Sequence, residues 1–383
     1  MRLSKQKNDR IKLAIYGDLS HLGGDPLVLL QLTKQLSQKG FRITLAGPIS
    51  KEILACADFS SWIHRLIPLN GQIYPQKIIH EQLMKDPPDA FLNSGPSPIL
   101  IETAMRFKKP LFWRIIGHPK WWSHFFGRMD HNAQQIIRAA GHCSERIIAV
   151  SDFLRAPFVQ EGFQNTETIY EGCNTDYFHP HADERLRFRK EFDLSEKDLA
   201  IGIVAHFAWQ KRHEIAVRAL SHLKKKSHAA KYFFIGGHFG RKMRNERGRL
   251  KGLIKKLGVL DKIIFTGVRN DIRRVINGLD ILLFPFLDEG FGMSLVEAMA
   301  CEKPVLVNDS GAFPELVQHG KEGIMVPAEN PLAFASGLDF LIQNPARRIA
   351  LGKMGRVKVI RNFSLKRQIE NYERFFKRYL NRI

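Results

Sequence analysis

Two glutamates that lie eight positions apart, Glu289 and Glu297, are the side chains of this sequence with the clearest potential for chemistry. An apolar run, residues 280–286 (DILLFPF), precedes them and is typical of a buried strand. Residues 291–301 follow and are rich in helix formers. The stretch therefore predicts a strand, a glycine-containing turn with Glu289 on it, and a helix that carries Glu297.

The turn between the two glutamates has the features of an anion site with a sugar contact beside it. Gly290 and Gly292 allow a ligand to approach the backbone closely. The first N–H groups of the predicted helix, around Phe291 and Met293, favour a negatively charged group. A carboxylate is a poor partner for phosphate but accepts hydrogen bonds from sugar hydroxyls. The residues favour a nucleotide-sugar site, although taken alone they are equally consistent with an acidic turn and a helix with one solvated glutamate.

This stretch resembles the sequence motif of the GT4-type retaining glycosyltransferases, which have the GT-B fold. Glu289 and Glu297 frame Gly-Phe-Gly, and Glu-Ala-Met-Ala closes the motif. Further segments match the family in order and spacing: FTG at 265–267, KPV at 303–305, GAFPEL at 311–316 and GKEGIMVP at 320–327. The resemblance is strong from about residue 200 to 330 and weaker but traceable from about residue 11 to 180.

The resemblance implies an α/β protein of the GT-B fold, in which two Rossmann-like domains, each with a doubly wound parallel sheet, face each other across a cleft. We expect an acceptor-side domain at 1–180, a nucleotide-sugar (donor) domain at 181–360, and a last helix at 361–383 that crosses back to the first domain. The sequence itself indicates a β–loop–α–β unit at the start of a parallel sheet, with strands at 11–17 and 41–46 around a helix at 26–39.

Four other segments carry expectations. Residues 179–194 are charged and are expected to be a mobile linker between the domains. They follow residues 171–174 (EGCN), which depart from the Asn-Gly-Val-Asp that the family usually has here. Residues 364–379 predict an amphipathic helix with one apolar face. The aromatic run at 121–126 (WWSHFF) is equally consistent with an acceptor pocket, a membrane-interface segment and a core helix.

The resemblance also assigns roles in the donor domain. It implies that Glu289 contacts the sugar ring of the donor and Glu297 the ribose of the nucleotide. Lys211 stands where the family has the lysine that binds the donor diphosphate, whereas His206 stands where an arginine is usual. A histidine can donate a hydrogen bond to phosphate but is fully charged only when protonated. Arg212 is an alternative cation, and a lysine after a strand is also consistent with ordinary surface.

Four further residues are candidates for the same site. Val268 lies where family members hold the nucleotide base. Gly23 and Gly24 lie beyond the carboxyl end of the first strand, where doubly wound sheets bind ligands; the resemblance implies that they face the donor phosphate and acceptor, although most such pairs are only tight turns. His118 follows a strand at 111–116 and lies where similar enzymes have an active-site histidine. A lone histidine is more often structural, but we predict a catalytic set of Glu289, His118 and Lys211.

Composition adds expectations about compartment and partners. The formal net charge is +21, and residues 181–383 hold 38 basic against 22 acidic side chains, compared with 21 against 16 in residues 1–180. The densest basic run, residues 241–256, draws the protein to an anionic membrane surface, a lipid-linked saccharide or nucleic acid, or is simply a solvated helix face. Four cysteines without metal-ligand spacing indicate reduced thiols in the cytoplasm. We expect neither a signal peptide nor a membrane span.

The expected function is that of a cytoplasmic, peripheral-membrane enzyme of surface-glycan synthesis, including lipopolysaccharide. It is a retaining glycosyltransferase that moves a sugar from a nucleoside-diphosphate sugar to a hydroxyl of a glycan or lipid-linked acceptor. No Asp-x-Asp pair is present to hold a metal, so we expect metal-independent catalysis and no cofactor. The alternatives are a sugar-nucleotide epimerase or phosphorolytic enzyme on the same fold, a degenerate nucleotide-binding module, and a basic nucleic-acid-binding protein. Nucleic acid is not expected, because only the charge supports it.

Overall fold

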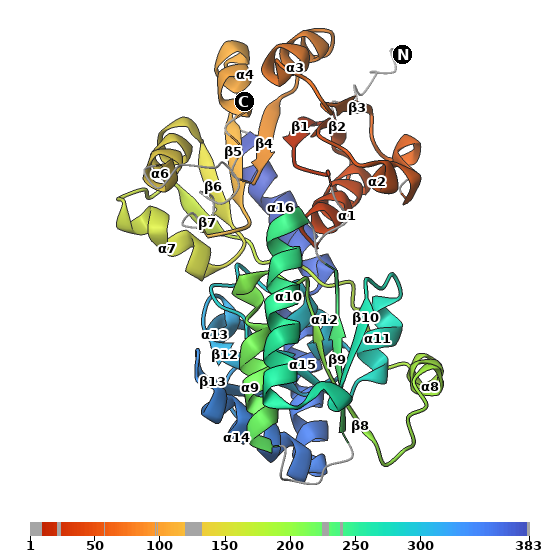
Figure 1. The fold of residues 1–383 in the computed structure, drawn as a ribbon. Helices are drawn as coiled ribbons and strands as arrows, with labels where there is room; N and C mark the ends of the chain where they lie inside the picture. The colour runs from red at the N-terminus through yellow and green to blue at the C-terminus, as the bar shows by residue number, and fades with distance from the viewer. Residues whose placement is uncertain are drawn as a thin grey trace. The chain divides into compact units, whose positions relative to one another are not determined.

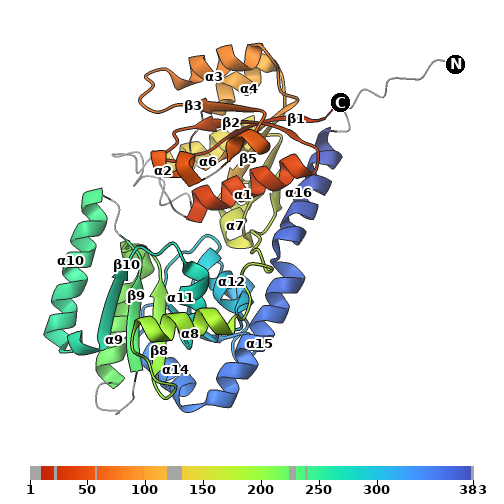
Figure 2. The same ribbon diagram turned by 90° about the vertical axis from the view of Figure 1, so that its right-hand side faces the viewer.

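The structure is a computed structural model of the 383-residue chain. It describes residues 10–20, 24–56, 58–95, 97, 99–118, 132–223, 230–237 and 240–380. These residues form two compact units, whose elements are labelled in Figures 1 and 2. The first unit comprises the described residues up to Tyr170 together with those from Gln368 onward, and the second unit comprises Glu171–Arg367. The division thus falls at Tyr170, whereas the sequence placed it at residue 180.

The first unit contains a seven-stranded parallel sheet in the order β3-β2-β1-β4-β5-β6-β7. The strands are β1 (Lys12–Tyr16), β2 (Arg42–Gly47), β3 (Arg65–Pro68), β4 (Ala90–Ser94), β5 (Leu111–Ile115), β6 (Arg146–Ala149) and β7 (Thr166–Thr168). Strands β4 and β5 are buried along their whole length, as expected of a parallel sheet covered on both faces. The order reverses between β1 and β4, which is the switch point of a doubly wound sheet.

Helices of the first unit come from both ends of the chain. They are α1 (Gly24–Gln38), α2 (Lys51–Cys56), α3 (Pro75–Met84), α4 (Leu100–Phe107), α6 (Asn132–Cys143), α7 (Asp152–Gln160) and α16 (Leu365–Leu380). Ser151 caps α7, and its side chain accepts a hydrogen bond from the N–H of Leu154. The predicted last helix is also confirmed as α16. Its Phe375 and Phe376 rings pack edge-on against Phe112 of β5, at centroid distances of 5.0 and 5.5 Å, so α16 completes the core of this unit.

The second unit contains a six-stranded parallel sheet in the order β10-β9-β8-β11-β12-β13. The strands are β8 (Leu199–Val204), β9 (Ala230–Ile235), β10 (Ile263–Gly267), β11 (Ile281–Phe284), β12 (Val305–Asp309) and β13 (Ile324–Pro327). The helices are α8 (Ala182–Glu191), α9 (His213–Leu223), α10 (Gly240–Leu257), α11 (Ile272–Gly278), α12 (Met293–Ala300), α13 (Phe313–Leu316), α14 (Pro331–Gln343) and α15 (Pro345–Asn362). Two parallel sheets with helices confirm the predicted α/β fold class.

Residues 179–194 do not form the mobile linker that the sequence predicted, because most of them form α8, which packs on α11. Phe188 of α8 is fully buried and fills the space beside Gly278, where a Cβ would overlap its ring. Glu184 accepts hydrogen bonds of 2.9 Å from Arg273 and Arg274 on α11. The charges of this segment therefore make ion pairs within the unit.

Candidate functional site

The switch point of the second sheet lies between β8 and β11, the two neighbours from which the strand order runs in opposite directions. Ligands of doubly wound sheets bind beyond the carboxyl ends of the strands at this point. The segment after β8 carries Lys211 at the end of a single 3-10 turn, Trp209–Lys211. The segment after β11 carries Glu289. A hydrogen bond of 2.8 Å from the N–H of Leu287 to the carbonyl of Gln210 joins the two segments.

Lys211 and Glu289 form an ion pair between Nζ and Oε2. The side chains are only 16% and 20% exposed, so the pair is partly withdrawn from water. The Lys211 ammonium also lies 4.5 Å from the centroid of the Phe286 ring, within cation–π range. Phe286 itself is fully buried and packs on Phe284 and Phe313. The cation is therefore held between a carboxylate and a fixed aromatic face.

The backbone at Glu289 is fixed by the loop that follows β12. The N–H of Ala312 donates to the Glu289 carbonyl at 2.9 Å, and the N–H of Asp288 donates to Oγ of Ser310 at 3.0 Å. Gly311 has a left-handed φ of +64°, and a Cβ there would lie 2.5 Å from the Glu289 carbonyl oxygen. Only glycine fits this close approach.

Helix α12 begins one residue after Gly292, whose left-handed φ of 101° turns the chain into the helix. The Gly292 carbonyl accepts hydrogen bonds from the N–H groups of Leu295 and Val296 at 3.0 and 3.2 Å. A Cβ at Gly292 would lie 2.8 Å from the ring of Phe313, so this turn too is restricted to glycine. The helix starts at Met293, later than the expected 291, and its first N–H groups and dipole make this end attractive to an anion.

Glu297 lies on α12, as predicted. Part of the residue is exposed, but its carboxyl group is desolvated, and this burial raises the pKa of Glu297 to about 8. Two buried thiols, Cys173 and Cys301, interact with it electrostatically. At neutral pH in the ligand-free protein, Glu297 therefore carries a proton and can act as a hydrogen-bond donor as well as an acceptor.

His206 follows β8 after one intervening residue, Ala205, and its carbonyl accepts a hydrogen bond of 2.9 Å from the N–H of Ala208. Behind this segment lies His213, which is 4% exposed and packs on Phe207 at a ring distance of 4.9 Å. Burial lowers the pKa of His213 to about 3, and the charges of His206 and Lys211 act in the same direction. His213 is therefore a neutral residue of the core, close to the two predicted phosphate contacts.

Val268 lies at the carboxyl end of β10 and is 66% exposed. A Cβ at Gly237 would lie 2.5 Å from a methyl group of Val268, so the glycine makes room for it. A hydrogen bond of 2.9 Å from the N–H of Phe207 to the Gly237 carbonyl joins the segments that follow β8 and β9. Val268 thus lies at the carboxyl edge of the sheet on the side of β9 and β10, whereas His206, like Lys211, lies in the segment after β8.

The remaining candidates belong to the first unit. His118 follows β5, and its ring lies 5.1 Å from that of Phe153. Gly24 is the first residue of α1, and a Cβ there would meet nothing within 4 Å, so its position does not itself require glycine. Gly23 and the aromatic run at 121–126 lie outside the described residues.

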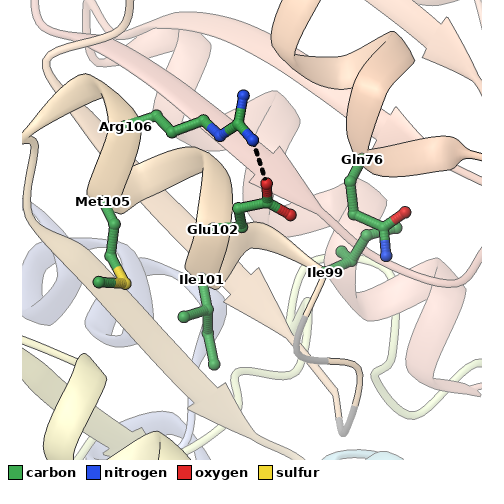
Figure 3. Close-up of a pocket in the computed structure, with 6 residues that line it drawn as sticks. All are labelled: Gln76, Ile99, Ile101, Glu102, Met105 and Arg106. Carbon is green, nitrogen blue, oxygen red and sulfur yellow. Dashed lines mark hydrogen bonds and ion pairs between the residues drawn. The ribbon is translucent and has the colours of Figure 1, made fainter.

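Two cavities of the described residues contain none of the predicted site residues. A cavity of 490 Å³ in the first unit lies at α3 and α4, where Arg106 and Glu102 form an ion pair (Figure 3). One of 410 Å³ in the second unit lies beside α9 and α10 and is lined in part by Trp209 and Arg212.

Sequence reasoning missed several residues of this site. Phe286 and Gly311 stand within the motifs DILLFPF and GAFPEL, but their contacts with Lys211 and Glu289 arise only in the folded chain. Arg212, the alternative cation, pairs with Glu214 and Glu329. Among the described residues, no group of three His, Cys, Asp or Glu side chains is placed to hold a metal ion, and no helix is long and apolar enough to cross a membrane.

Comparison with known proteins identifies the second unit. Residues 184–358 match the family glycosyl transferases group 1. The chain is 28% identical over 251 residues to the GDP-mannose-dependent alpha-(1-6)-phosphatidylinositol monomannoside mannosyltransferase of Mycobacterium tuberculosis. The matched region covers 63% of this chain and 62% of that protein. It is 28% identical over 226 residues to the D-inositol 3-phosphate glycosyltransferase of Corynebacterium jeikeium, which covers 55% of this chain and 54% of that protein.

The described fold is also similar to solved structures. The crystal structure of HepE from Anabaena in complex with UDP and glucose has a TM-score of 0.85 and 16% identity, and covers 96% of this chain and 100% of that chain. Among the first curated relatives, the chain spans 45% to 62% of their own length. Residues 184–358 are therefore a glycosyl transferases group 1 domain, which confirms the predicted family, and the chain has the two-unit GT-B fold.

Proposed function

We propose that this chain is a retaining glycosyltransferase that takes a sugar from a nucleoside-diphosphate sugar, without a metal ion. The observation that carries the proposal is the pairing of Lys211 with Glu289 at the switch point of the second sheet, inside a group 1 domain. HepE binds UDP and glucose in its crystal structure, and the mycobacterial relative is named for GDP-mannose. Both names support a nucleoside-diphosphate sugar as the donor.

The residues of the second unit supply what such a reaction needs. The bond between the anomeric carbon of the sugar and the diphosphate oxygen breaks, a bond to the acceptor oxygen forms, and the departing diphosphate takes the acceptor proton. Lys211, His206 and the start of α12 stabilise the negative charge that develops on the diphosphate. Glu289 accepts hydrogen bonds from sugar hydroxyls and Glu297 contacts the ribose, while Val268 lies against the base.

For the acceptor, we propose a hydroxyl group of a glycan, glycolipid or other lipid-linked molecule. The phosphatidylinositol monomannoside in the name of the mycobacterial relative, a glycolipid, supports this class. His118 and the turn at Gly23 and Gly24 contribute to the acceptor side. We place the enzyme in the cytoplasm, at the inner face of a membrane, because the basic helix α10 exposes Arg249, Lys255 and other cations that anionic lipids attract.

Thermal-shift screening with UDP, GDP, ADP, CDP and dTDP and with their sugars tests the donor, because a ligand that binds only the folded form raises its stability. With the donor found, Lys211→Ala and Glu289→Ala abolish transfer while circular dichroism shows folded protein. The control Lys353→Ala removes an exposed lysine of α15 and leaves transfer intact. Normal turnover by either site variant contradicts the proposal. Product analysis with and without acceptor separates transfer from epimerisation and phosphorolysis.

A further inference from the structure

The cation of the proposed phosphate site is already occupied in the ligand-free protein. Nζ of Lys211 pairs with the Glu289 carboxylate, and both side chains are four-fifths buried or more. The backbone of Glu289 cannot easily withdraw, because Ala312 donates to its carbonyl and Gly311 packs against it. A ligand that takes Lys211 must therefore separate it from a carboxylate that stays nearby.

The neighbouring side chains offer little relief to either partner. Arg212 lies next to Lys211 in the chain, but its guanidinium is shared between Glu214 and Glu329. His213 is buried and neutral. Phe286 contacts the ammonium through its ring face and supplies no full charge. If a bare diphosphate takes the ammonium, the Glu289 carboxylate is left partly buried without its cation and close to a second anion, and both effects are unfavourable.

We propose that Glu289 acts as a specificity switch that makes this site prefer a sugar-bearing diphosphate over the bare diphosphate. The inference rests on the proposed function and concerns the same site. A donor brings both groups that the exchange requires: its phosphates take Lys211, and its sugar hydroxyls replace the ammonium as hydrogen-bond donors to Glu289. After transfer the sugar leaves, Glu289 recovers Lys211, and the nucleoside diphosphate is released.

The test measures the affinities of the nucleoside diphosphate and of its sugar by isothermal titration calorimetry. Glu289→Gln keeps the shape and the acceptor oxygen of the side chain but frees the ammonium. The matched control, Glu329→Gln, removes a carboxylate from the adjacent cation Arg212 and leaves the Lys211–Glu289 pair in place. UDP, GDP, ADP, CDP and dTDP are tried first on the wild-type protein, so that the base is known before the variants are compared.

We expect Glu289→Gln to bind the bare diphosphate about tenfold more tightly than the wild type, the size of one lost competing ion pair. The nucleotide sugar gains less, so the ratio of the two affinities falls, whereas Glu329→Gln leaves that ratio unchanged. Glu289→Asp keeps the charge but shortens the side chain, and its ratio lies between those of the wild type and Glu289→Gln.

The outcomes separate the inference from the proposed function. If the wild type binds a nucleoside diphosphate and Glu289→Gln leaves the affinity ratio unchanged or raises it, the switch is refuted and the proposed function stands. A ratio that falls equally in Glu329→Gln also refutes the switch, because loss of negative charge anywhere near the site then explains the effect. If the wild type binds none of the diphosphates or their sugars, the proposed function itself is refuted.

Discussion

The proton on Glu297 gives a quantitative test of the site in the ligand-free protein. Desolvation raises the pKa of its carboxyl from an ordinary 4.5 to about 8. Between pH 5 and pH 8 the folded protein therefore retains a proton that the unfolded chain has lost. Because the folded state binds more protons, the free energy of unfolding falls as pH rises through this window. The penalty is largest above pH 8, where Glu297 is charged while still desolvated.

The magnitude follows from the size of the pKa shift. One pKa unit corresponds to about 1.4 kcal/mol, and some three units of the shift lie between pH 5 and pH 8, so this residue costs the folded state about 3–4 kcal/mol over that range. Glu297→Gln has no such proton. The difference in the free energy of unfolding, Glu297→Gln minus wild type, should therefore increase by about 3–4 kcal/mol from pH 5 to pH 8.

Hydrogen exchange of peptides that cover α12 is the appropriate assay, because it reports the stability of the second unit alone. Comparing the two proteins at each pH cancels the intrinsic pH dependence of exchange and most other titrations. The buried thiols do not interfere, since burial raises the pKa of Cys301 to about 12 and that of Cys173 well above its usual value. A parallel pH dependence in the wild type and in Glu297→Gln would refute a buried, protonated carboxyl.

Three other predictions concern the site and its surroundings. Gly311→Ala should destabilise the second unit by about 2–3 kcal/mol in urea unfolding, because the added Cβ meets the Glu289 carbonyl and the backbone φ is left-handed. The control is Gly320→Ala, where φ is also left-handed but a Cβ would meet nothing within 4 Å. This variant should cost only about 1 kcal/mol. Equal losses would count against the close approach. His206→Arg should strengthen nucleoside-diphosphate binding by calorimetry, because arginine is charged throughout the working pH range; weaker binding would show that His206 does not face phosphate. Reversal of the exposed charges Arg249 and Lys255 to glutamate should remove salt-sensitive binding to phosphatidylserine vesicles, and binding that survives reversal would exclude α10 as the membrane contact.

Most regular elements could be predicted from local pattern, because a buried parallel strand is an apolar run and a covering helix has an apolar face. The strand before Glu289, the helix that carries Glu297 and the last helix α16 are such cases. The sequence did not predict helix α8, because most of its residues are charged. The residues that it contacts, Arg273, Arg274 and Gly278, lie about ninety positions later in the chain. Helix α8 is stabilised by tertiary contacts, which cannot be read from the residues near it in the sequence.

The candidate site was predictable to a similar degree. The positions of Lys211 and Glu289 beyond neighbouring strands follow from the order of a doubly wound sheet, once the family motif had located the strands. That Lys211 lies on the face of Phe286, and that the Glu297 carboxyl is desolvated, depend on side-chain packing across the sheet. Periodicity gives the face of an element on which a residue lies, but not how much water reaches its polar atoms.

The chain enters the second unit once, after Tyr170, and leaves it once, before Gln368, so this unit is a continuous insertion within the first. Phe112 of the first unit is synthesised long before Phe375 and Phe376, which cover it. During synthesis, all six strands of the second unit can therefore be translated before α16, the helix that completes the core of the first unit. Folding of these two units should therefore begin with the inserted second unit, and the first unit should be the last to complete its core.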